Sequence, residues 1–265
     1  MSIFQAIILG IVQGITEFLP ISSSGHLIIL HQFFGIEKGA FTFDIVVHLG
    51  TLVAIVIYFW ADILALIKKP FSKMTGLLVV GTIPVVIAGF FLRNVMDNFR
   101  TGIWLAAAFT LTGVLLMVAD RITTTARKEE RDITWLDAFI IGCFQALGIP
   151  PGISRSGTTI TGGLVRGLNR ETAARFSFLL AIIAIAGATV LEHMSEFVQG
   201  DGANIAAIGI APVIVGFIVA TIVGYLSISL LLKLLKACKF KYFSFYLWGL
   251  AVLLFVDYFF VNQFF

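Results

Sequence analysis

Residues 13–26, QGITEFLPISSSGH, return in altered form 132 positions later as residues 145–158, QALGIPPGISRSGT. Among the identical pairs at that constant offset are Gly10, Gln13, Ile21, Ser22, Ser24, Gly25 and Ile28 with Gly142, Gln145, Ile153, Ser154, Ser156, Gly157 and Ile160. We infer a duplicated unit, with repeat one at residues 1–132 and repeat two at residues 133–265. Each copy keeps a polar element, broken by Gly and Pro, inside an apolar chain, and chemistry is expected there.

Composition indicates an integral membrane protein. Hydrophobic residues make up 59% of the 265 residues and charged residues 12%, and the mean hydropathy is +1.02, whereas soluble domains are about half apolar and a quarter charged. Six apolar runs approach or exceed the roughly 17 to 25 residues that a spanning helix needs, and they cover residues 45–67, 76–92, 103–119, 176–191, 205–235 and 243–265. We therefore expect an all-α fold with six transmembrane helices.

The two polar elements interrupt segments that are too short to cross a bilayer alone. Segment 3–19 ends at Pro20, and the next apolar stretch covers only residues 27–36. Residues 1–36 therefore form either one broken crossing helix or a re-entrant hairpin that returns to its own side, and residues 135–168 pose the same choice. The positive-inside rule can decide, because the two topologies assign the loops to different sides.

The basic residues favour the re-entrant topology. It places three of them on one side: Lys38, Arg93 and Arg100. It places 14 on the cytoplasmic side: Lys68, Lys69, Lys73, Arg121, Arg127, Lys128, Arg131, Arg166, Arg170, Arg175, Lys233, Lys236, Lys239 and Lys241. The crossing topology would split the same residues 10 to 7. With three spans in each repeat, the second repeat is inverted and both termini lie outside the cytoplasm.

The net charge of +3 does not indicate a nucleic-acid partner. The basic residues lie at the ends of the apolar runs and form no single stripe interleaved with aromatic residues. We expect lipid headgroups to be their neighbours.

The two polar tips are expected to meet and to form an anion site. Irregular backbone at membrane depth must be buried in protein or line a wet cavity. Residues 22–25 and 154–157 have the composition of caps for short helices, whose N-termini would point free N–H groups and positive dipole ends toward the centre. Two such ends facing one cavity favour a bound anion.

Arg155 is the one basic residue that this topology places within the membrane. An intramembrane charge costs from about 2.5 kcal/mol upward unless it is paired, so such a residue is a candidate functional group. The planar fork of arginine suits phosphate oxygens. The alternative is a structural arginine that binds loose backbone carbonyls.

Glu17 supplies the matching negative charge, and Gln13 lies one turn before it on the same helix face. Glu17 could hold a divalent cation, act as a general base, or form a purely structural bridge with Arg155. His26, at the start of the short helix after the first tip, could shuttle a proton, although a lone core histidine is the usual alternative.

Hydroxyl groups at both tips offer nucleophiles and phosphate ligands. Ser22, Ser23 and Ser24 are candidate nucleophiles as well as caps, and Ser23 is favoured because its equivalent in repeat two is an arginine instead of a serine. Polar groups expected to bind substrate are those of Gln13, Ser22, Ser24, Ser154, Ser156, Thr158 and Thr159. Asp44 and His48 are one turn apart near the start of a span, and we expect a hydrogen-bonded pair there instead of a second site.

The pattern Gln13-x-x-x-Glu17-Phe-Leu-Pro-Ile-Ser-Ser-Ser-Gly-His26, together with Pro151-Gly-Ile-Ser-Arg155-Ser-Gly-Thr-Thr159, resembles the undecaprenyl pyrophosphate phosphatase family linked to bacitracin resistance. In that family the first motif has Glu or Gln, three residues and Glu, and the second reads Pro-Gly-x-Ser-Arg-Ser. The resemblance implies that Glu17 and Gln13 serve in catalysis or hold a metal ion, with Glu17 as the only charged ligand of that motif. It implies a phosphate site formed by His26, Ser23, Ser154, Arg155 and Thr159.

The resemblance also implies the reaction, which is hydrolysis of undecaprenyl diphosphate to undecaprenyl phosphate and phosphate. This step recycles the lipid carrier for cell-wall synthesis in the bacterial inner membrane. A Mg²⁺ or Ca²⁺ ion, with Arg155 and the two helix ends, would neutralise charge on the transferred phosphoryl group. The attacking group is either Ser23 or a water prepared by Glu17 or His26. The expected partners are a polyprenyl diphosphate lipid, the bilayer and a second copy of the chain in a homodimer.

Transport is the rival function. Inverted repeats with broken helices that meet at the midplane are the architecture of secondary carriers, so the chain could instead be a lipid-phosphate flippase or secondary transporter with the same anion site. The set Glu17, His26, Ser23 and Arg155 favours the phosphatase, because carriage needs binding groups but not an acid, a base and a nucleophile together. A structural scaffold, the third class, would leave Arg155 unexplained.

Overall fold

The computed structural model describes residues 1–122, 127–199, 208–237 and 239–261. Its helices are α1 Ile3–Thr16, α2 Ser23–Phe34, α3 Ala40–Tyr58, α4 Trp60–Lys68, α5 Lys73–Leu92, α6 Gly102–Ile122, α7 Trp135–Leu147, α8 Arg155–Val165, α9 Arg170–Gln199, α11 Ile210–Ala237 and α12 Lys241–Val256. Short helical turns cover Arg93–Phe99, Glu130–Asp132 and Asp257–Val261. No β-strand occurs in the described residues, and the all-α prediction is confirmed.

Within the described residues, six helices are long and apolar enough to cross a membrane, in agreement with the predicted number of spans. They cover Ala40–Tyr58, Lys73–Leu92, Gly102–Ile122, Arg170–Thr189, Ile210–Leu234 and Lys241–Val261. The first predicted run, 45–67, is divided, because α3 ends at Tyr58 and α4 begins at Trp60. The α4 residue Asp62 pairs with Arg175 of α9, so this part of the run carries an ion pair between the repeats.

The two polar elements form helical hairpins, α1–α2 and α7–α8. Ser2 caps α1 and Thr134 caps α7, each through a capping box with the residue three positions later. The helices end before the prolines at 20 and 150–151, which cannot continue a helical hydrogen-bond ladder. With 14, 12, 13 and 11 residues, these four helices are shorter than the roughly 17 to 25 residues of a span.

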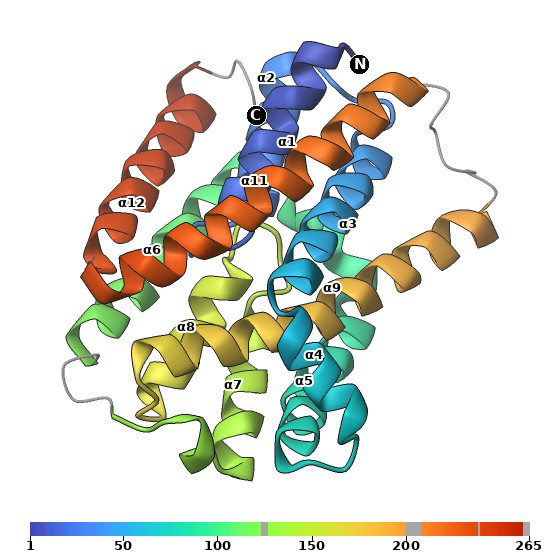
Figure 1. The fold of residues 1–265 in the computed structure, drawn as a ribbon. Helices are drawn as coiled ribbons and strands as arrows, with labels where there is room; N and C mark the ends of the chain where they lie inside the picture. Colours follow the sequence, from blue (N-terminus) through green and yellow to red (C-terminus); the bar gives the residue numbers. More distant parts are fainter. Residues whose placement is uncertain (123–126, 200–207, 238, 262–265) are drawn as a thin grey trace.

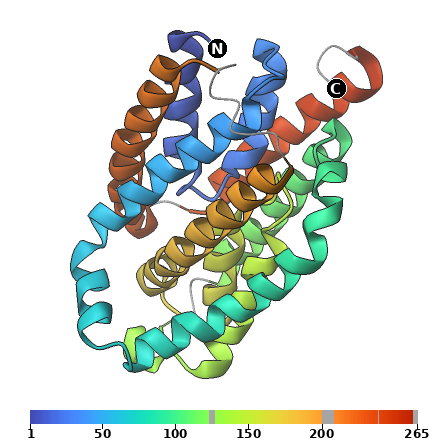
Figure 2. The ribbon, with the colours of Figure 1, turned by 90° about the vertical axis from the view of Figure 1, so that its right-hand side faces the viewer.

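The hairpins lie at opposite ends of the molecule and their tips meet in the middle (Figures 1 and 2). The backbone N–H of Gly152 in the second tip donates to Ser24 Oγ at 3.3 Å. Ser156 Oγ donates to the carbonyl of Leu19 in the first tip at 3.1 Å. The expected contact of the tips is therefore present, while the re-entrant and inverted arrangement across a bilayer stays a prediction.

Each hairpin packs on a span of the other repeat. Helix α1 lies against α11, and α7 lies against α5. The two approaches are close at equivalent glycines: a Cβ atom on Gly10 would lie 2.9 Å from the carbonyl oxygen of Gly216, and one on Gly142 would lie 2.3 Å from that of Gly81. Small residues permit such contacts between membrane helices. The hairpins therefore hold the two repeats together.

A buried aspartate ties the α7–α8 hairpin to the loop before it. The side chain of Asp137 is fully buried, with Arg166 Nε at 2.7 Å and Lys128 Nζ at 3.1 Å. Burial raises the pKa of Asp137, but hydrogen bonds from Thr134, Arg166 and Lys128 outweigh this effect and lower the pKa to about 2.

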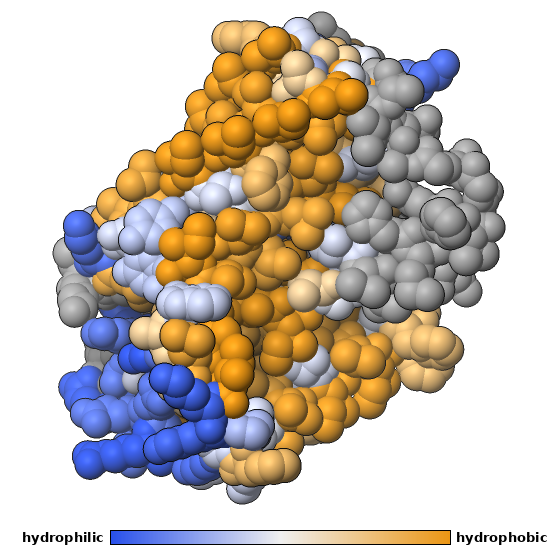
Figure 3. Space-filling model, turned by 45° about the vertical axis from the view of Figure 1, so that its right-hand side comes forward, coloured by the Kyte–Doolittle hydropathy of each residue, from blue (hydrophilic) through white to orange (hydrophobic). Residues whose placement is uncertain are grey.

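In the view of Figure 3, hydrophilic residues gather at the lower end of the molecule, below a broad apolar surface.

Candidate functional site

Serine caps begin the second helix of each hairpin. Ser22 Oγ accepts a hydrogen bond from Gly25 N at 3.3 Å, and Ser154 Oγ accepts one from Gly157 N at 3.1 Å. Ser22 has a φ of +69°, the only positive φ of a non-glycine residue in the described chain, whereas Ser154 has a φ of −75°. A sparsely populated backbone conformation costs on the order of 1–3 kcal/mol. The first tip is therefore strained at its cap, and the second is not.

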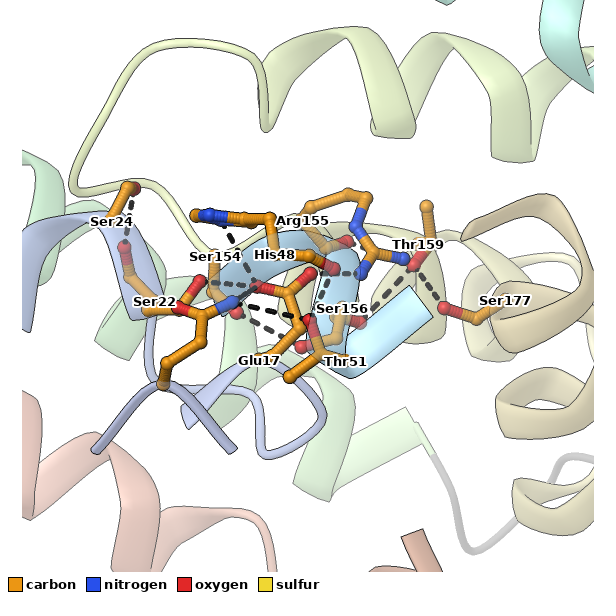
Figure 4. Close-up of polar contacts among 12 residues, drawn as sticks. Glu17, Ser22, Ser24, His48, Thr51, Ser154, Arg155, Ser156, Thr159 and Ser177 are labelled. Atoms are coloured by element: carbon orange, nitrogen blue, oxygen red, sulfur yellow. Dashed lines mark hydrogen bonds and ion pairs between the residues drawn. The ribbon is translucent and has the colours of Figure 1, made fainter. Parts of the chain in front are cut away.

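Glu17 is the centre of the polar contacts between the tips (Figure 4). It directly follows α1 and is only 7% exposed. Its Oε1 accepts a hydrogen bond from Arg155 Nη2 at 2.7 Å. Its Oε2 accepts from Ser23 Oγ at 2.5 Å and from Gln13 Nε2 at 3.1 Å, and His48 Nε2 lies 3.6 Å from the same atom. Donors on both oxygens offset the cost of burying this carboxylate.

Arg155 opens α8 and reaches across to the first tip (Figure 4). Its side chain is 16% exposed. While Nη2 binds Glu17, Nη1 is buried without a hydrogen-bond partner in the described part of the protein. A buried donor that is left unpaired costs free energy, so a ligand with acceptor oxygens would satisfy it. Arg155 therefore joins the tips and still has a donor for an anion.

Four of the predicted site residues thus contact one another: Gln13, Glu17, Ser23 and Arg155. The remaining predicted hydroxyls bond to the chain itself. Thr158 Oγ1 and Thr159 Oγ1 both donate to the Arg155 carbonyl, at 2.9 and 2.8 Å, and Thr159 also contacts Ser177 of α9. Ser22, Ser24, Ser154 and Ser156 hold the tips through the bonds described above. The role of these hydroxyls toward phosphate stays a prediction.

His26 lies apart from Glu17. Its Nδ1 is 2.6 Å from the Ser22 carbonyl oxygen, and its Nε2 is 2.8 Å from the hydroxyl of Tyr246 on α12. Among the described residues, the His26 ring forms no hydrogen bond with Ser23 or Glu17. The predicted proton shuttle at this position stays a prediction.

His48 is the site residue that sequence reasoning missed. The expected hydrogen bond between Asp44 and His48 is present, but it joins His48 Nδ1 to the backbone carbonyl of Asp44 at 2.7 Å. The Asp44 carboxylate binds His31 Nε2, also at 2.7 Å. The remaining nitrogen, His48 Nε2, faces Glu17. An ionisable residue inside a span is by itself a functional signal, and this signal could have identified His48. Thr51, one turn later on α3, accepts from Gln13 Nε2 at 3.3 Å.

The oxygen atoms at the site can be compared with the ligands that a divalent cation takes. Gln13 Oε1 is buried without a hydrogen-bond partner in the described residues, and Nε2 of the same amide donates to Glu17 Oε2. No three His, Cys, Asp or Glu side chains of the described chain gather where they could hold an ion. Mg²⁺ is usually bound by one or two carboxylates together with substrate phosphates and water. These atoms therefore fit a cation that takes most of its ligands from a diphosphate.

Comparison with known proteins agrees with the two motifs. Residues 6–253 match the protein family described as Bacitracin resistance protein BacA. The chain belongs to this family. It is 47% identical to a protein of Carboxydothermus hydrogenoformans named undecaprenyl-diphosphatase, over 97% of both chains. It is 45% identical to undecaprenyl-diphosphatase 4 of Bacillus thuringiensis subsp. konkukian over 96% of both chains. The undecaprenyl-diphosphatase of Thermodesulfovibrio yellowstonii is 41% identical over 98% of this chain and 99% of that protein.

Proposed function

We propose that this BacA-family chain hydrolyses undecaprenyl diphosphate to undecaprenyl phosphate and phosphate. The observation that carries the proposal is the contact of Ser23, Glu17 and Arg155, in which a hydroxyl, a carboxylate and a guanidinium meet between the tips. The names of the relatives support the same substrate. The transporter alternative has no support in those names.

The site binds the diphosphate through its positive groups. Arg155 Nη1, which has no protein partner in the described chain, donates to an oxygen of the terminal phosphate. The N-termini of α2 and α8 begin at Ser23 and Arg155, beside the Glu17 contact, so their positive ends favour the same anion. The prenyl chain stays in the bilayer, because each buried methylene contributes about 0.8 kcal/mol.

In the proposed reaction the Ser23 hydroxyl attacks the terminal phosphorus. Ser23 Oγ donates to Glu17 Oε2 at 2.5 Å, so Glu17 takes the proton as Oγ forms its bond to phosphorus. The bridging P–O bond breaks, and its electron pair leaves with undecaprenyl phosphate. Water then cleaves the phosphoserine with Glu17 again as the base, and phosphate is released. His48 Nε2, 3.6 Å from Glu17 Oε2, accepts the proton from Glu17 in this scheme.

Glu17 and the Gln13 carbonyl would hold a Mg²⁺ or Ca²⁺ ion together with the diphosphate oxygens. When bound, that ion neutralises charge on the phosphoryl group. Arg155 also neutralises charge on the phosphoryl group. Its hydrogen bond to Glu17 Oε1 fixes the orientation of the carboxylate.

The chain would work in the bacterial plasma membrane with both termini outside the cytoplasm. The basic residues of the loops support this orientation. The N-terminal residue and the end of α12 lie at the same end of the molecule, as this orientation requires (Figure 1). A homodimer stays a prediction.

Phosphate release from undecaprenyl diphosphate by the purified protein in detergent tests the proposal. We expect release that stops on chelation and returns with Mg²⁺ or Ca²⁺. With a substrate labelled in the terminal phosphate, acid quenching should trap label on the parent and none on Ser23→Ala. Absence of phosphate release with either ion would refute the phosphatase, whereas turnover of Ser23→Ala at the parent rate would refute Ser23 as the nucleophile.

A further inference from the structure

We propose that His26 and Tyr246 form a brace that holds the strained backbone of Ser22 and so directs the Ser23 hydroxyl at Glu17. Both are positioning residues in this proposal, which rests on the proposed function for its activity tests. The brace consists of the Ser22 carbonyl, the His26 ring and the Tyr246 hydroxyl.

The hydrogen bonds of the His26 ring define its role. The Ser22 carbonyl oxygen can only accept, so His26 Nδ1 carries the proton in their 2.6 Å contact. In the neutral ring Nε2 then accepts from the Tyr246 hydroxyl at 2.8 Å. The ring is nearly parallel to that of Tyr246, with an angle of 8° and 5.8 Å between centroids. Both nitrogens are thus engaged, and neither points to Ser23 or Glu17.

The Ser22 carbonyl is held twice. It accepts the backbone N–H of His26 at 3.4 Å in addition to the ring Nδ1–H. A short bond to this oxygen fixes the orientation of the peptide between Ser22 and Ser23, and therefore the direction of the Ser23 side chain. The φ of +69° at Ser22 is one that only glycine adopts without strain, so the fold must hold it in place.

Repeat two supplies an internal comparison. There the equivalent of Ser22 is Ser154, which has an ordinary φ of −75°. The equivalent of His26 at the 132-residue offset is Thr158, which has no ring nitrogens, and its hydroxyl donates to the Arg155 carbonyl instead. Strain and brace therefore occur together in repeat one and are both lacking in repeat two. Repeat one is also the repeat that carries Ser23.

Replacing His26 by two different amides separates positioning from proton transfer. Asparagine places an amide N–H near the position of Nδ1, whereas the longer glutamine places it near Nε2, and neither carries a proton between groups. We expect His26→Asn to turn over at least about tenfold faster than His26→Gln or His26→Ala, with KM similar in all three. Equal loss of kcat in His26→Asn and His26→Gln would overturn the brace and favour a proton shuttle.

Glycine at position 22 should remove the need for the brace. In the His26→Ala background, we expect Ser22→Gly to raise kcat by about tenfold, because glycine adopts the positive φ freely. In the parent, the same change should have less effect, since the brace already holds the backbone. Ser2→Gly is the control: Ser2 caps α1 at a negative φ outside the site, so glycine relieves no strain there and should not raise kcat in that background. Additive effects of His26→Ala and Ser22→Gly would overturn the proposal.

Tyr246→Phe removes only the hydroxyl of the brace, and Tyr242→Phe, one turn earlier on α12, is its control. We expect kcat to fall about threefold to tenfold in Tyr246→Phe and to stay at the parent value in Tyr242→Phe. Equal kcat in both variants would overturn the part assigned to Tyr246.

Thermal unfolding keeps the test independent of the activity. Ser22→Gly should raise the melting temperature more in His26→Ala than in the parent, whether or not the parent hydrolyses the lipid. If the parent releases no phosphate, the proposed function fails while this cycle still decides the brace. Equal shifts in both backgrounds would overturn it.

Discussion

Glu17 Oε1 and Arg155 Nη2 are 2.7 Å apart, although the two residues are separated by 138 positions in the sequence. One belongs to each tip, so the central ion pair exists only when the two repeats are assembled. Two buried atoms near this pair, Arg155 Nη1 and Gln13 Oε1, have no hydrogen-bond partner in the described chain. In the proposed reaction these two atoms bind the diphosphate and its cation.

Arg155→Lys should lose most of the turnover although it keeps the charge. A compact ammonium cannot bind Glu17 with one donor and phosphate with another in the planar geometry of a guanidinium. We expect kcat to fall by about 100-fold, with a smaller change in KM. Arg131→Lys, at an exposed position, is the control and should turn over like the parent. Parent turnover in Arg155→Lys would leave Arg155 a purely structural residue.

Glu17→Gln should abolish hydrolysis by at least about 100-fold, because the amide neither takes the Ser23 proton nor offers a charged ligand to a cation. The amide fills the same volume, so lipid-diphosphate binding should survive. Phosphate release and binding are measured on the same preparations, with Mg²⁺ or Ca²⁺ restored after chelation. Glu37→Gln, at an exposed position, should match the parent. Hydrolysis by Glu17→Gln at the parent rate would refute the mechanism.

His48→Gln should lower kcat by about tenfold, because it removes the proton path from Glu17 while an amide still occupies the space. The control is His31→Gln, whose amide can keep a hydrogen bond to Asp44 and which does not contact Glu17. Single-turnover rates of both variants check the prediction. If the two variants lose the same activity, His48 has no special role beside Glu17.

Asp137→Asn should lower the stability of the protein at neutral pH. The pKa of Asp137 is about 2 in the folded chain, below its ordinary value of 3.8, so its contribution to stability is fully present above pH 3.8 and is lost as the pH falls through 2. The shift corresponds to about 2 kcal/mol. Thermal unfolding in detergent should show a lower melting temperature for the variant at pH 7 and a smaller difference at low pH. A difference that does not depend on pH would contradict this account.

Labelling of single cysteines tests the orientation of the spans. In a cysteine-free background, Lys38→Cys should react with an impermeant reagent in intact cells, and Lys69→Cys should react only after the membrane is opened. The reverse result would mean that the termini lie in the cytoplasm.

The sequence predicted the fold class, and it also selected the polar residues that meet at the centre of the candidate site. The doubled polar element, interrupted by prolines, predicted where the hairpins break, and the scarcity of charge predicted Arg155 and Glu17. Tyr246 was not found, because it lies on a span where hydrophobic periodicity does not separate the inward face from the lipid face. In a bilayer both surroundings are apolar, so only the packing decides which polar residue points inward.

Backbone conformation was the second feature that could not be predicted. Ser22 and Ser154 are the same residue at equivalent positions, both cap a short helix, and both are followed by polar residues. Their φ angles nevertheless differ in sign, because the Ser22 carbonyl has the His26 ring as a partner and Ser154 has no equivalent. Tertiary contacts from the far end of the chain, in this case Tyr246, overrode the local pattern.

The packing of α1 against α11 imposes an order on biogenesis. Helix α1 is synthesised about 200 residues before α11, whose Gly216 and Val219 supply the surface that receives Gly10. At roughly 5–20 residues per second, the ribosome needs on the order of 10 to 40 seconds to reach that helix. During this interval the first hairpin lacks its packing partner, and its polar tip has no Arg155 until α8 is also in place. A nascent chain that stops before α11 therefore leaves the polar hairpin without the surface on which α1 packs.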